Sequence, residues 1–111
     1  MNPINEDEAE ILIEEHLRER GWDITDFAVT RKRWRDHLDG DEADRVLLHE
    51  GKVVAILEAQ KPGEDLWAAL DQAKGYARAC KRNTGGDVPF LFATDGTIYL
   101  RQNLEGLGYG E

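Results

Sequence analysis

The chain has 111 residues, of which 41% are hydrophobic and 33% charged, and its formal net charge is −9 at pH 7. That length suits one domain and leaves no room for a second module such as a helicase motor. The negative balance argues against a general nucleic-acid binder, which is usually basic. Clustered carboxylates are, however, what a divalent-metal site requires, so a metal-dependent enzyme is not excluded.

Membrane and secretion signals are not expected. The longest apolar run, Val53 to Leu57, is far too short for a membrane span, and the first seven residues do not resemble a signal peptide. The single cysteine, Cys80, has no partner for an internal disulfide, which agrees with a reducing cytoplasm and favours a helix-packing role. We expect one cytoplasmic domain over residues 1–111, with a flexible tail over 103–111.

The first predicted element is an amphipathic helix over residues 6–20. Asn5 with Glu8 three residues later is typical of a capping box, and Gly21 is typical of a helix stop. The apolar residues recur at helical spacing and form a stripe of Ala9, Leu12, Ile13 and Leu17.

A predicted hairpin lies in the middle of the chain. A short strand is expected over residues 26–30, followed by a charged loop. Residues 45–48 and 52–59 are β-rich and flank Glu50-Gly51, which indicates a hairpin turn. The second run is apolar on both faces, so we predict a central strand covered by helices on both sides.

A helix and two strands are predicted for the rest. The helix covers residues 64–79, with an apolar stripe of Leu66, Leu70, Ala73, Ala77 and Cys80. Strands are expected over 88–93 and 97–100, joined by a tight turn at Asp95-Gly96. The order αβββαββ predicts an α/β (α+β) fold, a mixed central β-sheet flanked by helices.

Two acids lie near the ends of the hairpin strands. Asp44 begins the first strand and Glu58 ends the second. A strict two-residue turn places Asp44 opposite Leu57, so that Asp44 and Glu58 lie on opposite faces of the sheet. In a strict two-residue turn the numbers of two paired residues add up to 101. One bulge changes this sum to 100 and sets Asp44 diagonal to Glu58 on the same face, and we therefore predict a bulge in this hairpin.

The pair Asp44 and Glu58 suits Mg²⁺, a hard cation that takes oxygen ligands. The alternative is structural, with Asp44 capping one strand and Glu58 ending another. For a lone pair of acids the structural reading is the default, but an acid directly after five apolar residues is less easily dismissed, because a buried carboxylate needs a compensating partner. Other chemistry is poorly supported, since the chain has no serine and its histidines lack metal-ligand spacing.

Two basic clusters stand out against the acidic background. One is Arg31-Lys32-Arg33-Trp34-Arg35, and the other is Arg78 with Lys81-Arg82. Each either contacts phosphates or forms a solvated surface.

The motifs resemble a known family. Ala-Asp-Arg-Val-Leu-Leu…Val-Val-Ala-Ile-Leu-Glu-Ala-Gln-Lys at 43–61 resembles the PD-(D/E)xK core of the nuclease domain at the start of type I restriction enzyme R subunits. Asp-Gln-Ala-Lys-Gly-Tyr-Ala at 71–77 resembles that family's QxxxY element. Pro-Phe-Leu-Phe-Ala-Thr-Asp-Gly at 89–96 resembles the strand and turn that follow. The similarity covers about residues 6–100.

The resemblance implies a restriction-endonuclease-like core and a Mg²⁺-dependent DNA endonuclease, with Mn²⁺ as a substitute metal. Asp44 and Glu58 are the implied metal ligands. Gln72 and Tyr76, four apart on one helix face, are implied to support DNA or the active site. The implied partners are DNA and other restriction–modification subunits.

Such nucleases often carry a further acid on a helix. Glu8 is our choice for this acid, with Asp7 and Glu14 as rivals.

Gln60 departs from the family pattern, because it stands where the motif has lysine. Losing a comparable transition-state donor costs about 3–4 kcal/mol, on the order of 10²–10³ in rate. Lys61 follows, but strand alternation points it to the opposite face unless a twist before Pro62 turns it inward. We expect an endonuclease, or alternatively a catalytically degenerate nuclease-fold module that binds DNA or a partner protein.

Overall fold

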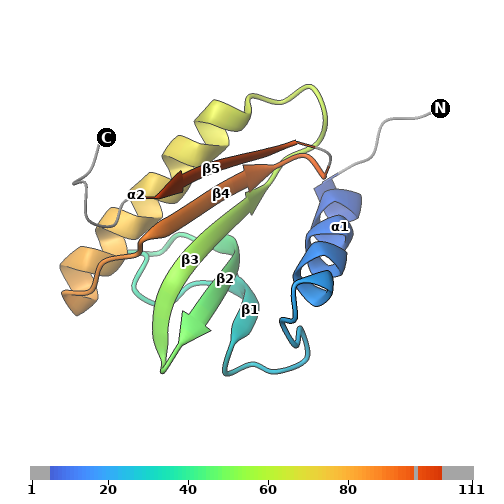
Figure 1. The fold of residues 1–111 in the computed structure, drawn as a ribbon. Helices are drawn as coiled ribbons and strands as arrows, with labels where there is room; N and C mark the ends of the chain where they lie inside the picture. The colour runs from blue at the N-terminus through green and yellow to red at the C-terminus, as the bar shows by residue number, and fades with distance from the viewer. Residues whose placement is uncertain (1–5, 97, 104–111) are drawn as a thin grey trace.

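A computed structural model describes residues 6–96 and 98–103 of the chain, which form a five-stranded sheet with one helix on each face (Figure 1). The order of elements is the predicted αβββαββ. The elements are α1 (Glu6–Glu19), β1 (Thr30–Trp34), β2 (Ala43–His49), β3 (Lys52–Ala59), α2 (Leu66–Thr84), β4 (Phe90–Thr94) and β5 (Tyr99–Asn103). The predicted Asn5 cap and the tail beyond Asn103 lie outside the described residues.

The sheet is mixed, with strand order β1-β2-β3-β4-β5. β3 runs parallel to β4, and the other neighbours are antiparallel. Parallel neighbours need a crossover connection, which α2 provides between β3 and β4. β3 is therefore the central strand, as its apolar sequence predicts.

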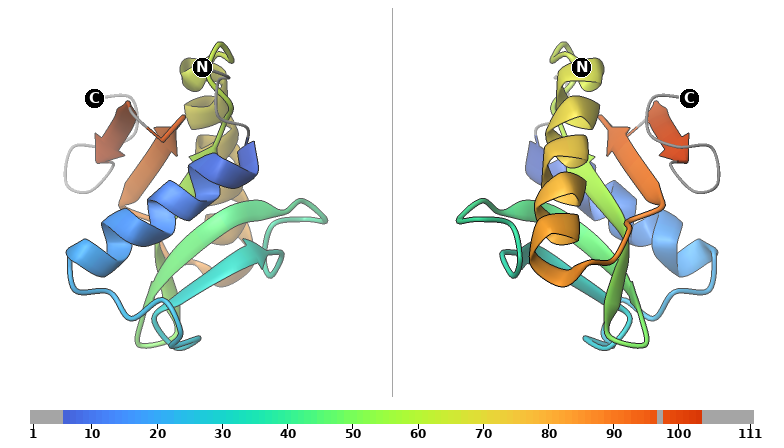
Figure 2. Two further views of the ribbon diagram at one scale, coloured as in Figure 1. Left: turned by 90° about the vertical axis from the view of Figure 1, so that its right-hand side faces the viewer. Right: turned by 90° about the vertical axis from the view of Figure 1, so that its left-hand side faces the viewer.

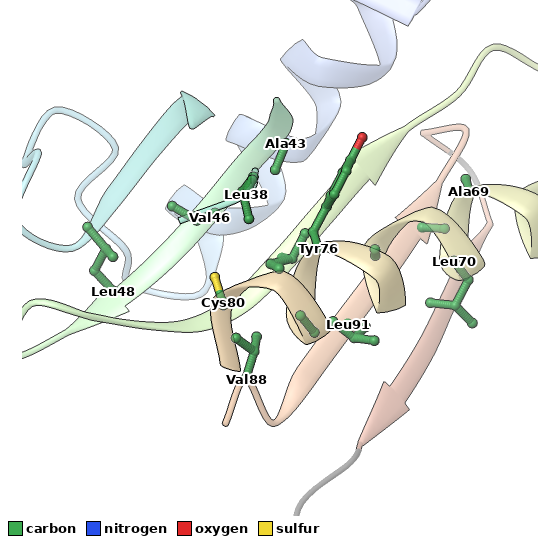
Figure 3. Packing of buried hydrophobic residues seen from close by; sticks show 14 residues of the cluster. Leu38, Ala43, Val46, Leu48, Ala69, Leu70, Tyr76, Cys80, Val88 and Leu91 are labelled. Atoms are coloured by element: carbon green, nitrogen blue, oxygen red, sulfur yellow. The ribbon is translucent and has the colours of Figure 1, made fainter. Parts of the chain in front are cut away.

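Two apolar clusters hold the helices against opposite faces of the sheet, and Figure 2 shows α1 and α2 on its two sides. The cluster on the α2 side includes Val46 and Ile56, and Figure 3 shows its packing. The cluster on the α1 side includes Leu47 and Leu57. Successive residues of β2 and β3 thus face different helices, which confirms the predicted double cover.

Both helices end where local backbone chemistry stops them. Gly21 has φ 91°, and the amide of Trp22 donates to the Leu17 carbonyl, which closes α1 as predicted. Asp65 caps α2, and Gly85 with φ 78° ends it. The predicted span 64–79 is therefore wrong by two residues at the start and five at the end. Neither described helix is long and apolar enough to cross a membrane.

The first and last strands differ from their predictions. Residues 26–29 form a turn in which the Asp26 carbonyl accepts from the Thr30 amide, so β1 begins where the predicted strand was to end. β1 then runs through the basic cluster that was assigned to a loop. Thr94 pairs with Tyr99, so the β4–β5 connection has four residues in place of a tight turn at Asp95-Gly96. Residue 97 lies outside the described part of the chain.

The predicted bulge is present in the β2–β3 hairpin, and its direction differs from the prediction. His49 pairs with Lys52 and Leu48 with Val53, which is the register of a two-residue turn. The register then shifts, and Leu47 pairs with Ala55. The extra residue lies on β3, so the paired positions sum to 102 in place of 100.

Candidate active site

The bulge brings the two predicted metal ligands directly opposite each other. Arg45 pairs with Leu57, and extending that register by one residue sets Asp44 against Glu58. At this point the backbone ladder is replaced by side-chain bonds. The Asp44 amide donates to Glu58 Oε2 at 3.0 Å, and the Ala59 amide donates to Asp44 Oδ2 at 2.7 Å. Both carboxylates are therefore held in place by the backbone of the neighbouring strand.

Glu58 is an unusually placed acid, with only 3% of its surface exposed. Burial and, after it, the negative charge of nearby Asp44 together raise the pKa of its carboxyl to about 9, while the hydrogen bond from the Asp44 amide opposes the shift. Among the described residues, neither acid forms an ion pair with a lysine or arginine. The pair therefore has negative charge in a poorly solvated place without a balancing cation.

Tyr76 joins this pair from α2. Its ring packs in the apolar cluster, and its hydroxyl points out of that cluster (Figure 3). The hydroxyl donates to the Glu58 carboxylate, a bond that favours the ionised acid. Burial and the charges of Glu58 and Asp41 raise the pKa of Tyr76, which keeps the phenol protonated. The structure thus brings Asp44, Glu58 and Tyr76 together.

Gln60 and Lys61 lie just beyond the pair. Gln60 is half-buried, and its backbone N–H donates to the Thr94 carbonyl at 2.8 Å, which continues the contact between β3 and β4. Lys61 is exposed, and its Nζ lies 3.7 Å from Glu64 Oε1. That surface ion pair holds the lysine in the solvent-facing loop before α2.

Gln72 is exposed on α2, one helical turn before Tyr76. Residues four apart share a helix face, so Gln72 continues the Tyr76 side of the helix toward its start.

The acids of α1 belong to the other layer, because the buried stripe of α1 packs on the opposite face of the sheet from Glu58. Glu8 is exposed there. Glu14 forms an ion pair with Arg45, whose side chain is only 7% exposed. The side chain of Asp7 lies outside those that the structure describes.

The donor set of the site suits a hard divalent cation. Among the described residues, no group of three or more His, Cys, Asp or Glu side chains is placed to hold a metal. Mg²⁺ is nevertheless commonly bound through one or two carboxylates, with waters and substrate phosphates completing its coordination. Asp44 and Glu58 offer carboxylate oxygens on adjacent strands, and their mutual repulsion is what a cation would relieve.

The sequence motifs did not single out two features of this site. The backbone amide of Ala59, which holds Asp44, carries no side-chain signal. Asp41 acts on Tyr76 through its charge, and the acidic run Asp39-Gly40-Asp41-Glu42 was its only trace in the sequence.

One comparison with known proteins identifies a family. The family described as the type I restriction enzyme EcoKI endonuclease subunit second domain matches residues 18–109. Because the match covers most of the chain, the chain belongs to this type I restriction enzyme family. No curated protein and no solved structure matches it significantly.

Proposed function

We propose that this member of a type I restriction enzyme family is a Mg²⁺-dependent endonuclease domain that hydrolyses DNA phosphodiesters. It would act in the cytoplasm on foreign DNA, together with other restriction–modification subunits. The observation that carries the proposal is the reciprocal bonding of Asp44 and Glu58 at the ends of β2 and β3. Two acids fixed by the backbone form a preorganised site, since neither needs to reorient to bind a cation.

In this proposal Asp44 and Glu58 would hold the cation, which when bound would supply water activation and charge neutralisation at the phosphate. Tyr76 donates to Glu58 and so favours the ionised form that binding requires. Gln60, two residues after Glu58 and just beyond the end of β3, positions the attacking water through its side-chain amide. Gln72 contacts DNA from the exposed turn of α2.

A degenerate module that binds DNA or a partner protein is the second candidate. Gln60 favours it, because an amide lacks the positive charge that lysine offers a developing phosphate charge. The deep burial of Glu58 also favours it, since a protonated carboxyl at neutral pH needs no metal. The two candidates differ in metal binding.

Calorimetric titration of Mg²⁺ and Mn²⁺ into the chain, with a short DNA duplex present, tests the proposal. We expect saturable binding by the wild type and none by Asp44→Ala. Asp44→Asn should also fail to bind, although its amide oxygen retains an acceptor for the Ala59 amide. Asp71→Asn is the matched control, because Asp71 is an exposed acid that faces Lys74 on α2, and this variant should bind like the wild type.

Absence of metal binding in the wild type would favour the degenerate module. An equal loss of metal binding in Asp44→Asn and Asp71→Asn would mean that binding depends only on the net charge of the protein, which would contradict a site at Asp44.

A further inference from the structure

β1 is an exposed basic strand at one edge of an acidic molecule. Arg31, Lys32 and Arg33 are all exposed, and none of them forms an ion pair within the described part of the chain. Many of the other described cations are paired with acids, among them Arg35, Arg45 and Arg82. We call the three β1 cations the basic edge. In a chain of net charge −9, such a concentration of unpaired positive charge indicates an anionic partner.

The backbone of β1 is distorted at Arg33, the last residue of the basic edge. Arg33 has φ 55°, a left-handed conformation that is uncommon for a residue other than glycine. This breaks the alternation of the strand, so that Arg31 and Trp34, three apart, lie on the same face. The Arg31 guanidinium carbon lies 5.3 Å from the centre of the Trp34 ring and 5.9 Å from that of Phe27.

The two rings preorganise Arg31. A guanidinium stacked on aromatic faces keeps its N–H groups directed outward, where they match the oxygens of a phosphate. Phe27 is 73% exposed, so the ring gains little from burial in the fold. A strained backbone and an exposed ring that together fix one arginine are typical of a binding surface.

The basic edge lies beside the acid pair. Arg31 pairs with Val46, which packs on the α2 side of the sheet, the side that Glu58 faces. Asp44 lies two residues before Val46 on the same face, and Arg33 lies between the two residues of β1 that pair with Arg45 and Ala43. Strand spacing and rise place the Arg31 and Asp44 backbones roughly 8 Å apart.

We propose that Arg31 and Arg33 of the basic edge bind the phosphate backbone of duplex DNA and set it across the acid pair. This rests on the proposed function, because DNA is the substrate there. The partner follows from charge: duplex DNA is a dense line of phosphates, and planar guanidinium groups bind phosphate in a bidentate manner. The alternative is that edge cations only prevent pairing with another strand.

Salt-dependent binding of a fluorescent DNA duplex to the full chain, measured by anisotropy in a chelator, tests this proposal. Each phosphate contact contributes about 0.9 to the slope of log affinity against log salt. The double variant Arg31→Gln/Arg33→Gln should therefore make this negative slope shallower by about 1.8, with weaker binding at every salt concentration. Arg31→Lys keeps the charge and should keep the slope, while its affinity falls because lysine lacks the flat stacked donor.

The matched control is Arg20→Gln/Arg101→Gln, which removes the same charge. These two arginines line a cleft of about 630 Å³ on the α1 side, and Arg101 belongs to β5, the strand at the opposite edge of the sheet. The control should keep the wild-type slope. Circular dichroism and thermal unfolding establish that each variant is folded.

Equal slopes in the basic-edge variant and the wild type would overturn the proposal, as would the same loss in the control. Absence of duplex binding by the wild type at low salt would overturn it as well. Because the assay contains no metal, its outcome is independent of the Mg²⁺ titration. If the basic-edge variant shows the expected change in salt dependence but the wild type binds no Mg²⁺, the basic edge stands as a DNA-binding surface and the endonuclease proposal is rejected.

Discussion

Asp44 and Glu58 hold each other across β2 and β3: the Asp44 amide donates to Glu58 Oε2 at 3.0 Å, and the amide after Glu58 donates to Asp44 Oδ2 at 2.7 Å. Each carboxylate therefore replaces a carbonyl acceptor where the backbone ladder ends. The arrangement fixes both acids and sets two carboxyl groups together in a buried place, where burial and the charge of Asp44 raise the pKa of Glu58 to about 9. Such a site costs stability, which is expected where function requires strain.

The pH dependence of stability should reveal Glu58. Its pKa in the folded state, about 9, exceeds the ordinary value of 4.5 for a glutamate, so between these two pH values the folded state binds a proton that the unfolded state has lost. The free energy of unfolding should therefore fall as pH rises from about 4.5 toward 9, by on the order of 3 kcal/mol up to neutral pH. Glu58→Gln cannot titrate and should be more stable than the wild type at high pH. Urea denaturation across this pH range measures the free energy of unfolding of both proteins. Curves of stability against pH that run parallel for the wild type and Glu58→Gln would contradict the raised pKa.

Tyr76→Phe should separate packing from the hydroxyl bond. The ring remains in the apolar cluster, so the loss of stability should be about 1 kcal/mol. Without the donated hydrogen bond the pKa of Glu58 should rise further, because that bond favours the carboxylate. Mg²⁺ affinity should then reach its maximum at a higher pH than in the wild type, as followed by calorimetry. An unchanged pH profile would mean that Tyr76 does not act on Glu58.

Gln60→Lys should raise DNA cleavage in Mg²⁺. Restoring a cation beside the phosphate should increase the rate by about 10²–10³ if the domain is an endonuclease. Lys61→Gln is the paired test of the adjacent lysine. Lys61 is exposed and faces Glu64, so its loss should leave cleavage unchanged. A large loss in Lys61→Gln would assign the lysine role to residue 61 and reject this prediction.

Glu14→Gln should affect stability and leave metal binding intact. Glu14 is the ion-pair partner of Arg45, whose side chain is 7% exposed. Neutralising the acid leaves a buried guanidinium poorly compensated, which should lower the free energy of unfolding by roughly 1–3 kcal/mol. Glu15→Gln, an exposed neighbour, should change neither property. Reduced Mg²⁺ affinity in Glu14→Gln would instead place the helix acid in the site.

The fold was largely predictable because hydrophobic periodicity encodes burial. The stripe Ala9, Ile13 and Leu17 and the run Val53 to Leu57 both correspond to buried surfaces, since their spacing determines which helix or sheet face meets the core. β1 was misplaced because its residues are almost all exposed, so no apolar period marks it. Its start depends on the turn that Asp26 makes, which is a backbone feature.

The site was predictable as a pair of residues, and its geometry was not. The need for Asp44 and Glu58 to share a face predicted a bulge. An extra residue on either strand satisfies that need, because the two acids share a face whether the numbers of paired residues sum to 100 or to 102. Only the backbone decides which strand carries the extra residue. The raised pKa of Glu58 depends on its burial in the assembled fold, for which residue 58 itself carries no signal.

Anomalous diffraction from crystals soaked in Mn²⁺ above neutral pH is the most direct test of the acid pair. We predict a peak at Asp44 and Glu58, the two residues that would hold the cation. The same soak of Asp44→Asn should show no peak there. A crystal of the wild type with Mn²⁺ bound elsewhere, or with no peak at Asp44 and Glu58, would contradict the metal site and with it the endonuclease.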